Sequence, residues 1–94
     1  MILVCYDIHN TRNRTKLSKY LERYGRRLQF SIFEIDQHYT ILNTIKSTIK
    51  QDFATRLRNN DSILIVPMLA SMDHKIIRHG AKIQKEKGYV TICA

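Results

Sequence analysis

The amino-acid sequence predicts a mixed fold of class α+β or α/β, because strand-like and helix-like segments alternate along it. Short apolar runs rich in β-prone residues occupy 1–6, 28–35 and 62–66, and segments with a helical repeat of apolar residues, about 12–24 and 40–57, separate them. The chain has 94 residues, the length of one small domain. We therefore expect residues 1–94 to form a single domain.

The first strand and the first helix have the clearest signals. Residues 1–6, with the sequence MILVCY, form a continuous apolar run that predicts a strand covered on both faces. Asn10 or Thr11 can cap the helix that follows. Within that helix a core-facing stripe about 100° wide is formed by Leu17, Tyr20, Leu21 and Tyr24. Gly25 stands where a helix would end.

The middle of the chain repeats this alternation. Apolar residues in 28–35 fall on both faces of a period-two pattern, which predicts one long strand or a bent pair of strands. The second helix, 40–57, has an apolar residue every four positions: Ile41, Ile45, Ile49 and Phe53. The Asn-Asn-Asp sequence at 59–61 ends it. Pro67 closes the strand 62–66, since proline cannot donate a ladder hydrogen bond.

The last twenty residues have weaker signals. Residues 75–78 and 89–93 are each compatible with a short strand, and the charged segment 82–87 between them is compatible with a turn or a short helix. The pairing of the segment 81–94 stays open.

The charge balance is the most informative global feature. Sixteen Lys and Arg stand against eight Asp and Glu, a formal net charge of +8. The chain is otherwise 44% apolar and 26% charged, which excludes a disordered or low-complexity segment. A positive electrostatic potential over much of the surface of a small domain predicts a polyanionic partner, most commonly nucleic acid.

Several functional classes are excluded. The two cysteines, Cys5 and Cys93, are too few for a disulfide framework or a zinc cluster. No apolar stretch approaches the roughly 20 residues of a membrane span, so we expect no membrane partner and a reduced, cytoplasmic protein. Phosphate-cradling glycine loops and nucleophile elbows are also absent from the sequence.

The positive charge is concentrated between residues 12 and 27. This basic stripe has seven members, with Glu22 as the one acid among them: Arg12, Arg14, Lys16, Lys19, Arg23, Arg26 and Arg27. Positions 12, 16, 19 and 23 share one side of a helix. The stripe is either a solvated helix face or a surface that binds the phosphate backbone in a salt-sensitive, sequence-independent way. The shortage of acids for ion pairing along the helix favours the second interpretation.

Asp7 is the candidate for chemistry, because it follows a buried strand and precedes a helix. Asp is also a common turn and capping residue, so the position alone does not decide its role. One carboxylate holds Mg²⁺ poorly, since this ion takes six oxygen ligands. A symmetric dimer would remove that difficulty by bringing two copies of Asp7 together. His9, two residues later, is either an assistant to Asp7 or a surface turn residue, and the second interpretation is favoured.

These sequence features resemble a known family. The resemblance is carried by Val-Cys-Tyr-Asp-Ile at 4–8, by the basic helix, by Tyr-Gly-Arg-Arg-Leu-Gln-Phe-Ser-Ile-Phe-Glu at 24–34, and by Asp-Ser-Ile-Leu-Ile-Val-Pro-Met at 61–68. In order and in length they resemble the small CRISPR-associated adaptation proteins of the Cas2 family. The likeness covers almost the whole chain and is weakest over 81–94.

The resemblance carries implications for fold and function. It implies a ferredoxin-like βαββαβ sandwich of class α+β, with extra C-terminal strand material, that forms a homodimer. It also implies a CRISPR-associated integrase as partner, with which the dimer captures and integrates new spacer DNA. Some members are metal-dependent nucleases that act on single-stranded RNA or double-stranded DNA. By that likeness Asp7 is the catalytic residue and the ligand of Mg²⁺, or another divalent cation, at the dimer centre.

Three functional hypotheses follow. The first is a metal-dependent endonuclease that uses Asp7. The second is a non-catalytic, architectural dimer that binds duplex DNA through the basic stripe. The third is a toxin-type ribonuclease of a similar fold.

Overall fold

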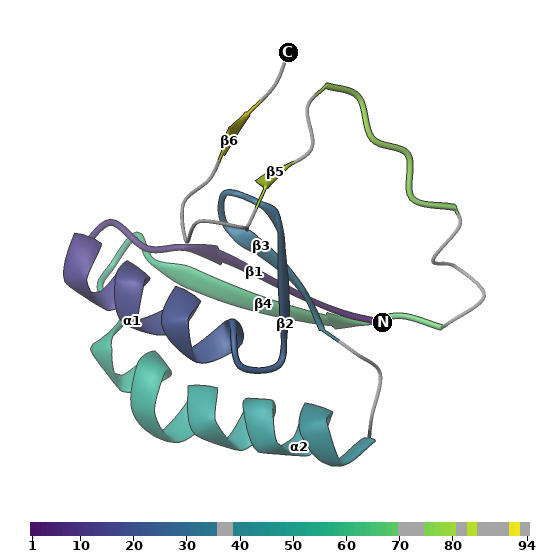
Figure 1. Ribbon diagram of the computed structural model, residues 1–94. Helices are drawn as coiled ribbons and strands as arrows, with labels where there is room; N and C mark the ends of the chain where they lie inside the picture. The colour runs from purple at the N-terminus through teal and green to yellow at the C-terminus, as the bar shows by residue number, and fades with distance from the viewer. Residues whose placement is uncertain (36–38, 70–74, 81–82, 85–90, 93–94) are drawn as a thin grey trace.

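The computed structural model describes residues 1–35, 39–69, 75–80, 83–84 and 91–92. Its elements, in chain order, are β1 (Ile2–Asp7), α1 (Thr11–Leu21), β2 (Gly25–Gln29), β3 (Ile32–Ile35), α2 (Tyr39–Thr48), the π-helical segment η1 (Ile49–Phe53), the 3₁₀ segment η2 (Ala54–Arg56), β4 (Ser62–Pro67), β5 (Ile83–Gln84) and β6 (Thr91–Ile92). Figure 1 shows that α1 and α2 lie on the same side of the sheet.

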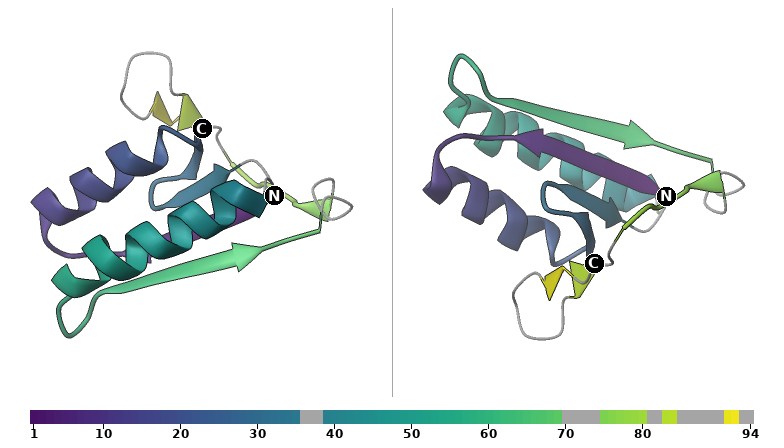
Figure 2. Two further views of the ribbon diagram at one scale, coloured as in Figure 1. Left: turned by 90° about the horizontal axis from the view of Figure 1, so that it is seen from below. Right: turned by 90° about the horizontal axis from the view of Figure 1, so that it is seen from above.

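The first four strands form one antiparallel sheet in the order β2-β3-β1-β4. The two views in Figure 2 show both helices side by side on one face of this sheet. A βαββαβ chain with this strand order is a ferredoxin-like fold, so the expected fold class is confirmed. The order makes β1 the neighbour of β4, although 54 residues lie between Asp7, the last residue of β1, and Ser62, the first residue of β4.

The core lies between the sheet and the two helices. Ile2, Val4 and Tyr6 of β1 are buried in it, and Tyr6 stacks on Phe33 of β3. The alternate positions of β1 lie on the opposite face, where Asp7 is exposed. The prediction that both faces of this strand are covered is therefore wrong for the isolated chain, since only the helix-facing side is fully buried.

The helix α1 follows the sequence expectation at its start. The Asn10 side chain accepts a hydrogen bond of 2.9 Å from the Asn13 backbone N–H, which caps the helix. Leu17 and Leu21 are fully buried, as the apolar stripe predicted. The helix ends at Leu21, three residues earlier than expected, because residues 22–24 form the turn that leads into β2.

The segment 25–35 is a hairpin of two strands, so one long strand over 28–35 is wrong, and the pair begins at Gly25, three residues earlier than expected. A register shift between Arg27 and Gln29 changes the face on which later residues lie. Gly25 is the first residue of β2, and a Cβ there would collide with the backbone carbonyl of Glu34 in β3. The glycine is required by this close approach of two strands.

The second helix contains a π-helical turn that the sequence pattern did not reveal. Its apolar residues recur every four positions. Because one α-helical turn takes 3.6 residues, each of these residues lies about 40° further around the helix axis than the one before. The wider turn η1 absorbs that advance, so that Ile45, Ile49 and Phe53 are all buried against the core. The predicted helix 40–57 is thus correct in position but is built from three kinds of helical turn.

The end of the chain differs in part from expectation. The strand β4 extends through Pro67, which pairs opposite Ile2 at the end of the ladder. Residues 75–78 form no strand, so that prediction is wrong. β5 at Ile83–Gln84 replaces the expected turn or helix there and pairs with β6 at Thr91–Ile92, inside the expected strand 89–93. The remainder of 82–87 and 89–93 lies outside the described residues.

The sheet face opposite the helices is called the open face below. It carries Asp7 at the end of β1 and Leu64 of β4, whose exposed fraction is 60%. Within the described residues, no helix has the length and apolar character to cross a bilayer.

Candidate metal and nucleic-acid site

Asp7 lies at the end of β1, on the open face of the sheet. Its Cα pairs with that of Ser62, the first residue of β4, and its side chain is 74% exposed. Tyr6, the preceding residue, points into the core, where burial raises the pKa of its hydroxyl. The structure therefore separates the two residues and leaves Asp7 as the accessible one.

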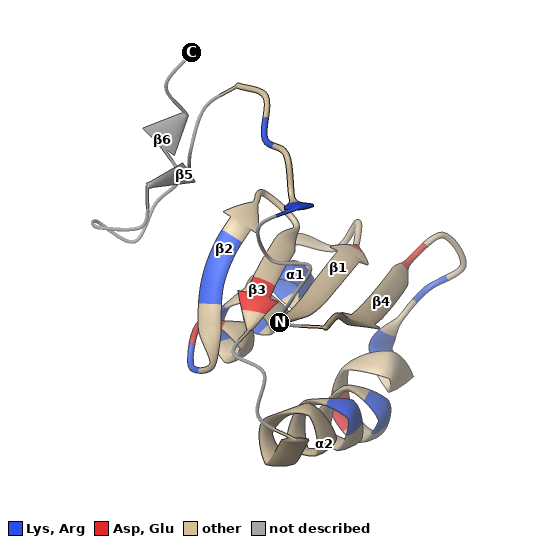
Figure 3. Cartoon of the chain, turned by 90° about the vertical axis from the view of Figure 1, so that its right-hand side faces the viewer, with Lys and Arg blue, Asp and Glu red and all other residues tan. Residues whose placement is uncertain are grey.

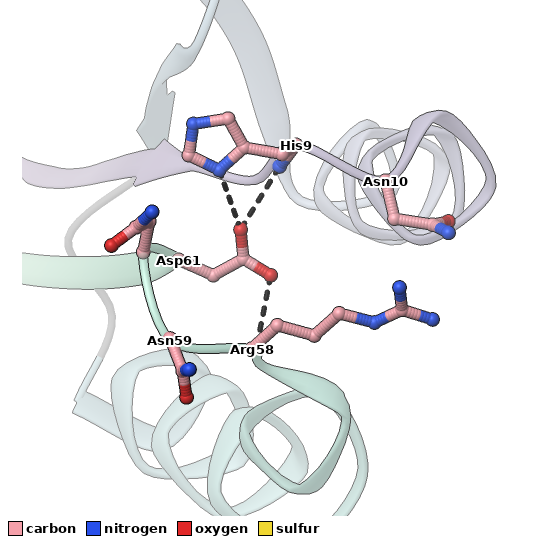
Figure 4. Close-up of a pocket in the computed structure, with 6 residues that line it drawn as sticks. His9, Asn10, Arg58, Asn59 and Asp61 are labelled. Carbon is pink, nitrogen blue, oxygen red and sulfur yellow. Dashed lines mark hydrogen bonds and ion pairs between the residues drawn. The ribbon is translucent and has the colours of Figure 1, made fainter.

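A histidine and a second aspartate lie directly beside Asp7. The His9 Nδ1 atom is 2.8 Å from Oδ1 of Asp61, and the His9 backbone N–H donates to the same oxygen at 3.0 Å. The backbone N–H of Arg58 donates to Oδ2 of Asp61, also at 3.0 Å. Figure 4 shows that the two bonds from His9 join the loop after β1 to the loop before β4, whereas the bond from Arg58 lies within the latter loop.

These hydrogen bonds control the ionisation of the pair. The backbone N–H groups of His9 and Arg58, together with the His9 ring, lower the pKa of Asp61 to about 2. The hydrogen bond to Asp61, followed by the charge of Asp7, raises the pKa of His9 above its usual value. Asp61 is consequently ionised at neutral pH and holds the histidine ring in place.

His9 in turn faces Asp7. The Nε2 atom of the ring, opposite the nitrogen that bonds Asp61, is 3.9 Å from Oδ1 of Asp7. The three side chains form a row in which Asp61 is buried and the other two are exposed, since only 2% of the Asp61 side chain is accessible compared with 63% for His9. We call Asp7, His9 and Asp61 the acid–histidine row.

A polar hollow adjoins this row. It has a volume of about 610 Å³ and is lined by His9, Asn10, Arg58, Asn59, Asn60 and Asp61. Figure 4 shows the Arg58 side chain reaching along it toward Asn10. A guanidinium and several amide groups around one hollow suit a ligand with oxygen acceptors, such as a phosphate group.

The sequence did not predict the pairing of His9 with Asp61. His9 was considered as an assistant to Asp7, but the interpretation as a turn residue was favoured, and Asp61 was interpreted as part of a helix-ending segment. The two are 52 positions apart, and only the pairing of β1 with β4 brings them together. The signal that could have revealed them is the strand order of the ferredoxin-like fold, which places the end of β1 beside the start of β4.

The expected divalent cation can be compared with the donors that this chain offers. No group of three or more His, Cys, Asp or Glu side chains among the described residues could hold a metal ion by itself. The Asp7 carboxylate is exposed and offers hard oxygen ligands, so it fits one side of an open site whose other positions take water or substrate.

The basic stripe is divided by the fold. Arg12, Lys16, Lys19 and Arg23 are exposed along α1 and the turn after it. Figure 3 shows basic residues on α1 and on β2, on two different parts of the molecule. Three members take part in contacts within the chain and are less available to a partner: Arg14, Arg26 and Arg27.

The contacts of these three arginines are specific. Arg14 donates to the backbone carbonyl of Ile8 at 3.1 Å, at the start of α1. Arg26 forms an ion pair of 3.1 Å with Glu34 across the β2–β3 hairpin. Arg27 is largely buried, with its guanidinium 4.9 Å from the centre of the Phe33 ring.

A groove runs between α1 and the second helix. It has a volume of about 560 Å³ and is lined by Lys16, Lys19, Tyr20, Arg23, Tyr24, Thr48, Asp52 and Phe53. The Tyr20 ring lies 5.4 Å from the rings of both Tyr24 and Phe53. Three of the four exposed basic residues thus line one groove over a cluster of aromatic rings.

Comparison with known proteins gives consistent matches. The sequence profile of the family described as CRISPR associated protein Cas2 matches residues 1–76. The CRISPR-associated endoribonuclease Cas2 4 of Rhodospirillum rubrum is 31% identical over 83 residues, which are 88% of this chain and 64% of that protein. The CRISPR-associated endoribonuclease Cas2 1 of Methanospirillum hungatei is 32% identical over 80 residues, which are 83% of this chain and 81% of that protein. This chain therefore spans somewhat less than two thirds of the first of these relatives.

Two solved structures are also similar. The crystal structure of Streptococcus pyogenes Cas2 at pH 6.5 superposes with a TM-score of 0.65 at 24% identity, over 84% of this chain and 98% of that one. A hypothetical protein from Thermus thermophilus, TT1823, superposes with a TM-score of 0.61 at 28% identity, over 72% of this chain and 79% of that one. Both agree with the ferredoxin-like topology.

Proposed function

This chain belongs to the CRISPR-associated protein Cas2 family, and on that premise we propose that it is a divalent-metal-dependent endonuclease with Asp7 as its catalytic and metal-binding residue. The observation that carries the proposal is the position of Asp7, an exposed carboxylate beside a histidine that a buried aspartate orients. The names of the relatives from Rhodospirillum rubrum and Methanospirillum hungatei, both endoribonucleases, support RNA as substrate, and we propose the single-stranded form. Double-stranded DNA is the alternative substrate.

In the proposed hydrolysis of a phosphodiester, Asp7 binds the metal and Arg58 binds a phosphate. Asp7 would hold Mg²⁺ or another divalent cation on the open face of the sheet. When bound there, the cation would lower the pKa of a water ligand and offset charge on the phosphate in the transition state. Arg58, in the adjoining hollow, offers a guanidinium for a neighbouring phosphate.

We propose further that two copies of the chain associate through their open faces. Leu64 is 60% exposed on the edge strand β4, and Leu3, Cys5 and Val66 beside it on that face are only half-buried. Apolar side chains on one face of a sheet are typical of a surface that a partner covers. Because Asp7 is on the same face, a two-fold axis near it would supply the second carboxylate that a magnesium site needs.

The proposal is tested by the metal dependence and substrate range of the purified chain. We expect cleavage of single-stranded RNA with Mg²⁺ or Mn²⁺ and none with EDTA. A double-stranded DNA of matched sequence, incubated in parallel, decides between the two substrates. Equal cleavage with and without divalent metal would contradict the proposal. A chain that cleaves neither the RNA nor the DNA would also contradict it.

A second candidate function has its own supporting observation. Lys16, Lys19 and Arg23 are exposed, and none of the ion pairs among the described residues involves them. Long basic side chains with no acidic partner are suited to the phosphate backbone of duplex DNA. In this interpretation the dimer is an architectural subunit that, with the CRISPR-associated integrase, holds new spacer DNA for integration, and Asp7 catalyses no reaction.

A further inference from the structure

The acid–histidine row presents two metal-ligating atoms at one place on the surface. Oδ1 of Asp7 and Nε2 of His9 are 3.9 Å apart, and both side chains are mostly exposed. Two ligands at about 2.1 Å from a common metal ion are about 3.0 to 3.4 Å apart in octahedral or tetrahedral geometry. The Asp7 side chain is exposed, so its rotation can close the difference while Asp61 holds the His9 ring.

The hydrogen bonds of His9 leave the correct nitrogen available. Nδ1 lies 2.8 Å from a carboxylate oxygen of Asp61, so the ring hydrogen is assigned to Nδ1. In the neutral ring Nε2 then carries the lone pair, and it faces Asp7. Histidines that ligate metals in proteins commonly donate their other ring N–H to a carboxylate, which fixes the tautomer and the orientation of the ring.

Asp61 is itself held firmly enough to serve that purpose. Its side chain is 2% exposed, and its two oxygens accept backbone hydrogen bonds from His9 and Arg58. The carboxylate is therefore fixed to both loops that frame the site. This support is what an outer-shell residue needs in order to orient a ligand.

We propose that His9 is a second metal ligand beside Asp7, that Asp61 is the outer carboxylate that orients it, and that the site consequently prefers a transition-metal ion such as Mn²⁺ to Mg²⁺. Imidazole nitrogen is a good ligand for transition metals, whereas Mg²⁺ binds oxygen and retains water. Water and substrate oxygens complete the coordination, as in other open catalytic sites. The inference rests on the proposed role of Asp7 as a metal ligand.

The test uses Mn²⁺ as the probe and needs no nuclease activity. Metal-free full-length protein is titrated with Mn²⁺ and followed by electron paramagnetic resonance, and pulsed measurements then detect ¹⁴N coupling from a coordinated imidazole. We expect one Mn²⁺ site with ¹⁴N coupling in the wild type. His9→Gln should lose the coupling and bind Mn²⁺ about tenfold more weakly or worse, and Mg²⁺ should displace Mn²⁺ only at a large excess.

Matched variants separate the causes. His79→Gln removes another exposed histidine, remote in sequence from the row, and should leave the coupling unchanged. Asp61→Asn should weaken Mn²⁺ binding by about 10- to 100-fold, the usual effect of losing an outer-shell partner. Circular dichroism and thermal unfolding of each variant verify that the fold is intact. His9→Gln alters an exposed side chain, so its result does not depend on Asp61→Asn folding normally.

The outcomes distinguish this inference from the proposed function. Mn²⁺ that binds in an Asp7-dependent way without ¹⁴N coupling, or with a coupling that persists in His9→Gln, would overturn the role of His9 and leave Asp7 as a metal ligand. Mn²⁺ binding that is unchanged in Asp7→Asn, or no binding at all, would overturn both.

Discussion

The Asp61 carboxylate shows how one residue can serve both the fold and the site. It accepts hydrogen bonds from the backbone of His9, the backbone of Arg58 and the ring of His9. These donors stabilise the ionised form, and they are lost when the chain unfolds. The same bonds that join two loops therefore also keep His9 facing Asp7.

This arrangement predicts how stability depends on pH. The pKa of Asp61 is about 2 in the folded chain and 3.8 for an unperturbed Asp, so its contribution to stability is complete above about pH 5. It is lost progressively as the pH falls from about 5 to 1. Thermal unfolding of the wild type and Asp61→Asn should therefore give a difference in midpoint that is largest above about pH 5 and small at about pH 2.

Asp52→Asn is the control for this comparison, because Asp52 is an exposed acid on the second helix, paired with Arg56. Its effect on the midpoint should be small at every pH, as is usual for a surface ion pair. A difference between wild type and Asp61→Asn that stays constant from pH 2 to 6 would contradict the role given to the carboxylate.

At this scale the sequence predicted one part of the site and not the other. Asp7 could be identified because it follows a strand directly, a local relation that needs no knowledge of the fold. The contact between His9 and Asp61 depends on the pairing of β1 with β4, and no local pattern encodes it. The roles of Arg14 and Arg27 were hidden for the same reason, since their partners are fixed by the turn into α1 and by the hairpin.

The helix α1 is the element on which the nucleic-acid hypothesis depends. Of the basic stripe, Lys16, Lys19 and Arg23 line the groove between the helices, whereas Arg27 lies against an aromatic ring in the hairpin. A charged helix edge with no acidic partners binds phosphates mainly by releasing counterions. Its contribution can therefore be measured as a salt dependence.

A triple variant tests the role of this helix. Lys16→Gln, Lys19→Gln and Arg23→Gln together should weaken binding to duplex DNA and reduce the slope of log K against log salt by up to about 2.7, because each phosphate that the protein no longer neutralises lowers the slope by about 0.9. Fluorescence anisotropy across a salt series measures both quantities. All three side chains are exposed, so the fold should be unaffected.

Lys46→Gln, Lys50→Gln and Arg56→Gln together are the matched control, because they remove the same charge from the exposed side of the second helix and its extension. This control should retain most of the affinity and the slope. Equal losses of affinity in the two triple variants would mean that net charge alone governs binding, which would contradict a specific role for α1.

Most elements could be predicted from the sequence, and the exceptions have physical causes. Strands β1 and β4 and both helices follow from continuous apolar runs and from helical spacing. The hairpin was ambiguous because the shift between Arg27 and Gln29 breaks the period-two pattern. The π-helical turn was not predicted, since a four-residue repeat is compatible with an ordinary helix until the position of Phe53 in the core is known.

For the whole molecule, the open face of the sheet links the fold to the proposed dimer. The helices cover one side of the sheet and leave the other with Asp7 and an exposed leucine. We expect Leu64→Glu to convert the dimer to a monomer, because it places a charge among the apolar side chains of the proposed interface. Size-exclusion chromatography with light scattering measures the mass.

Ile77→Glu is the control, since Ile77 is 79% exposed and lies outside the sheet. It should leave the mass of the dimer unchanged. A wild-type chain that is monomeric at every concentration tested, or a Leu64→Glu variant that remains dimeric, would contradict association through the open face.

Asp7 is the proposed catalytic residue of the hydrolysis. Its most direct test is the rate at which Asp7→Asn cleaves single-stranded RNA with Mg²⁺ or Mn²⁺, compared with the wild type and with Asp52→Asn. The substitution preserves the size of the side chain and removes the charge that holds the cation. We predict that Asp7→Asn lowers the rate on the order of 100-fold or more while Asp52→Asn has the wild-type rate. Cleavage by Asp7→Asn at the wild-type rate would contradict the account.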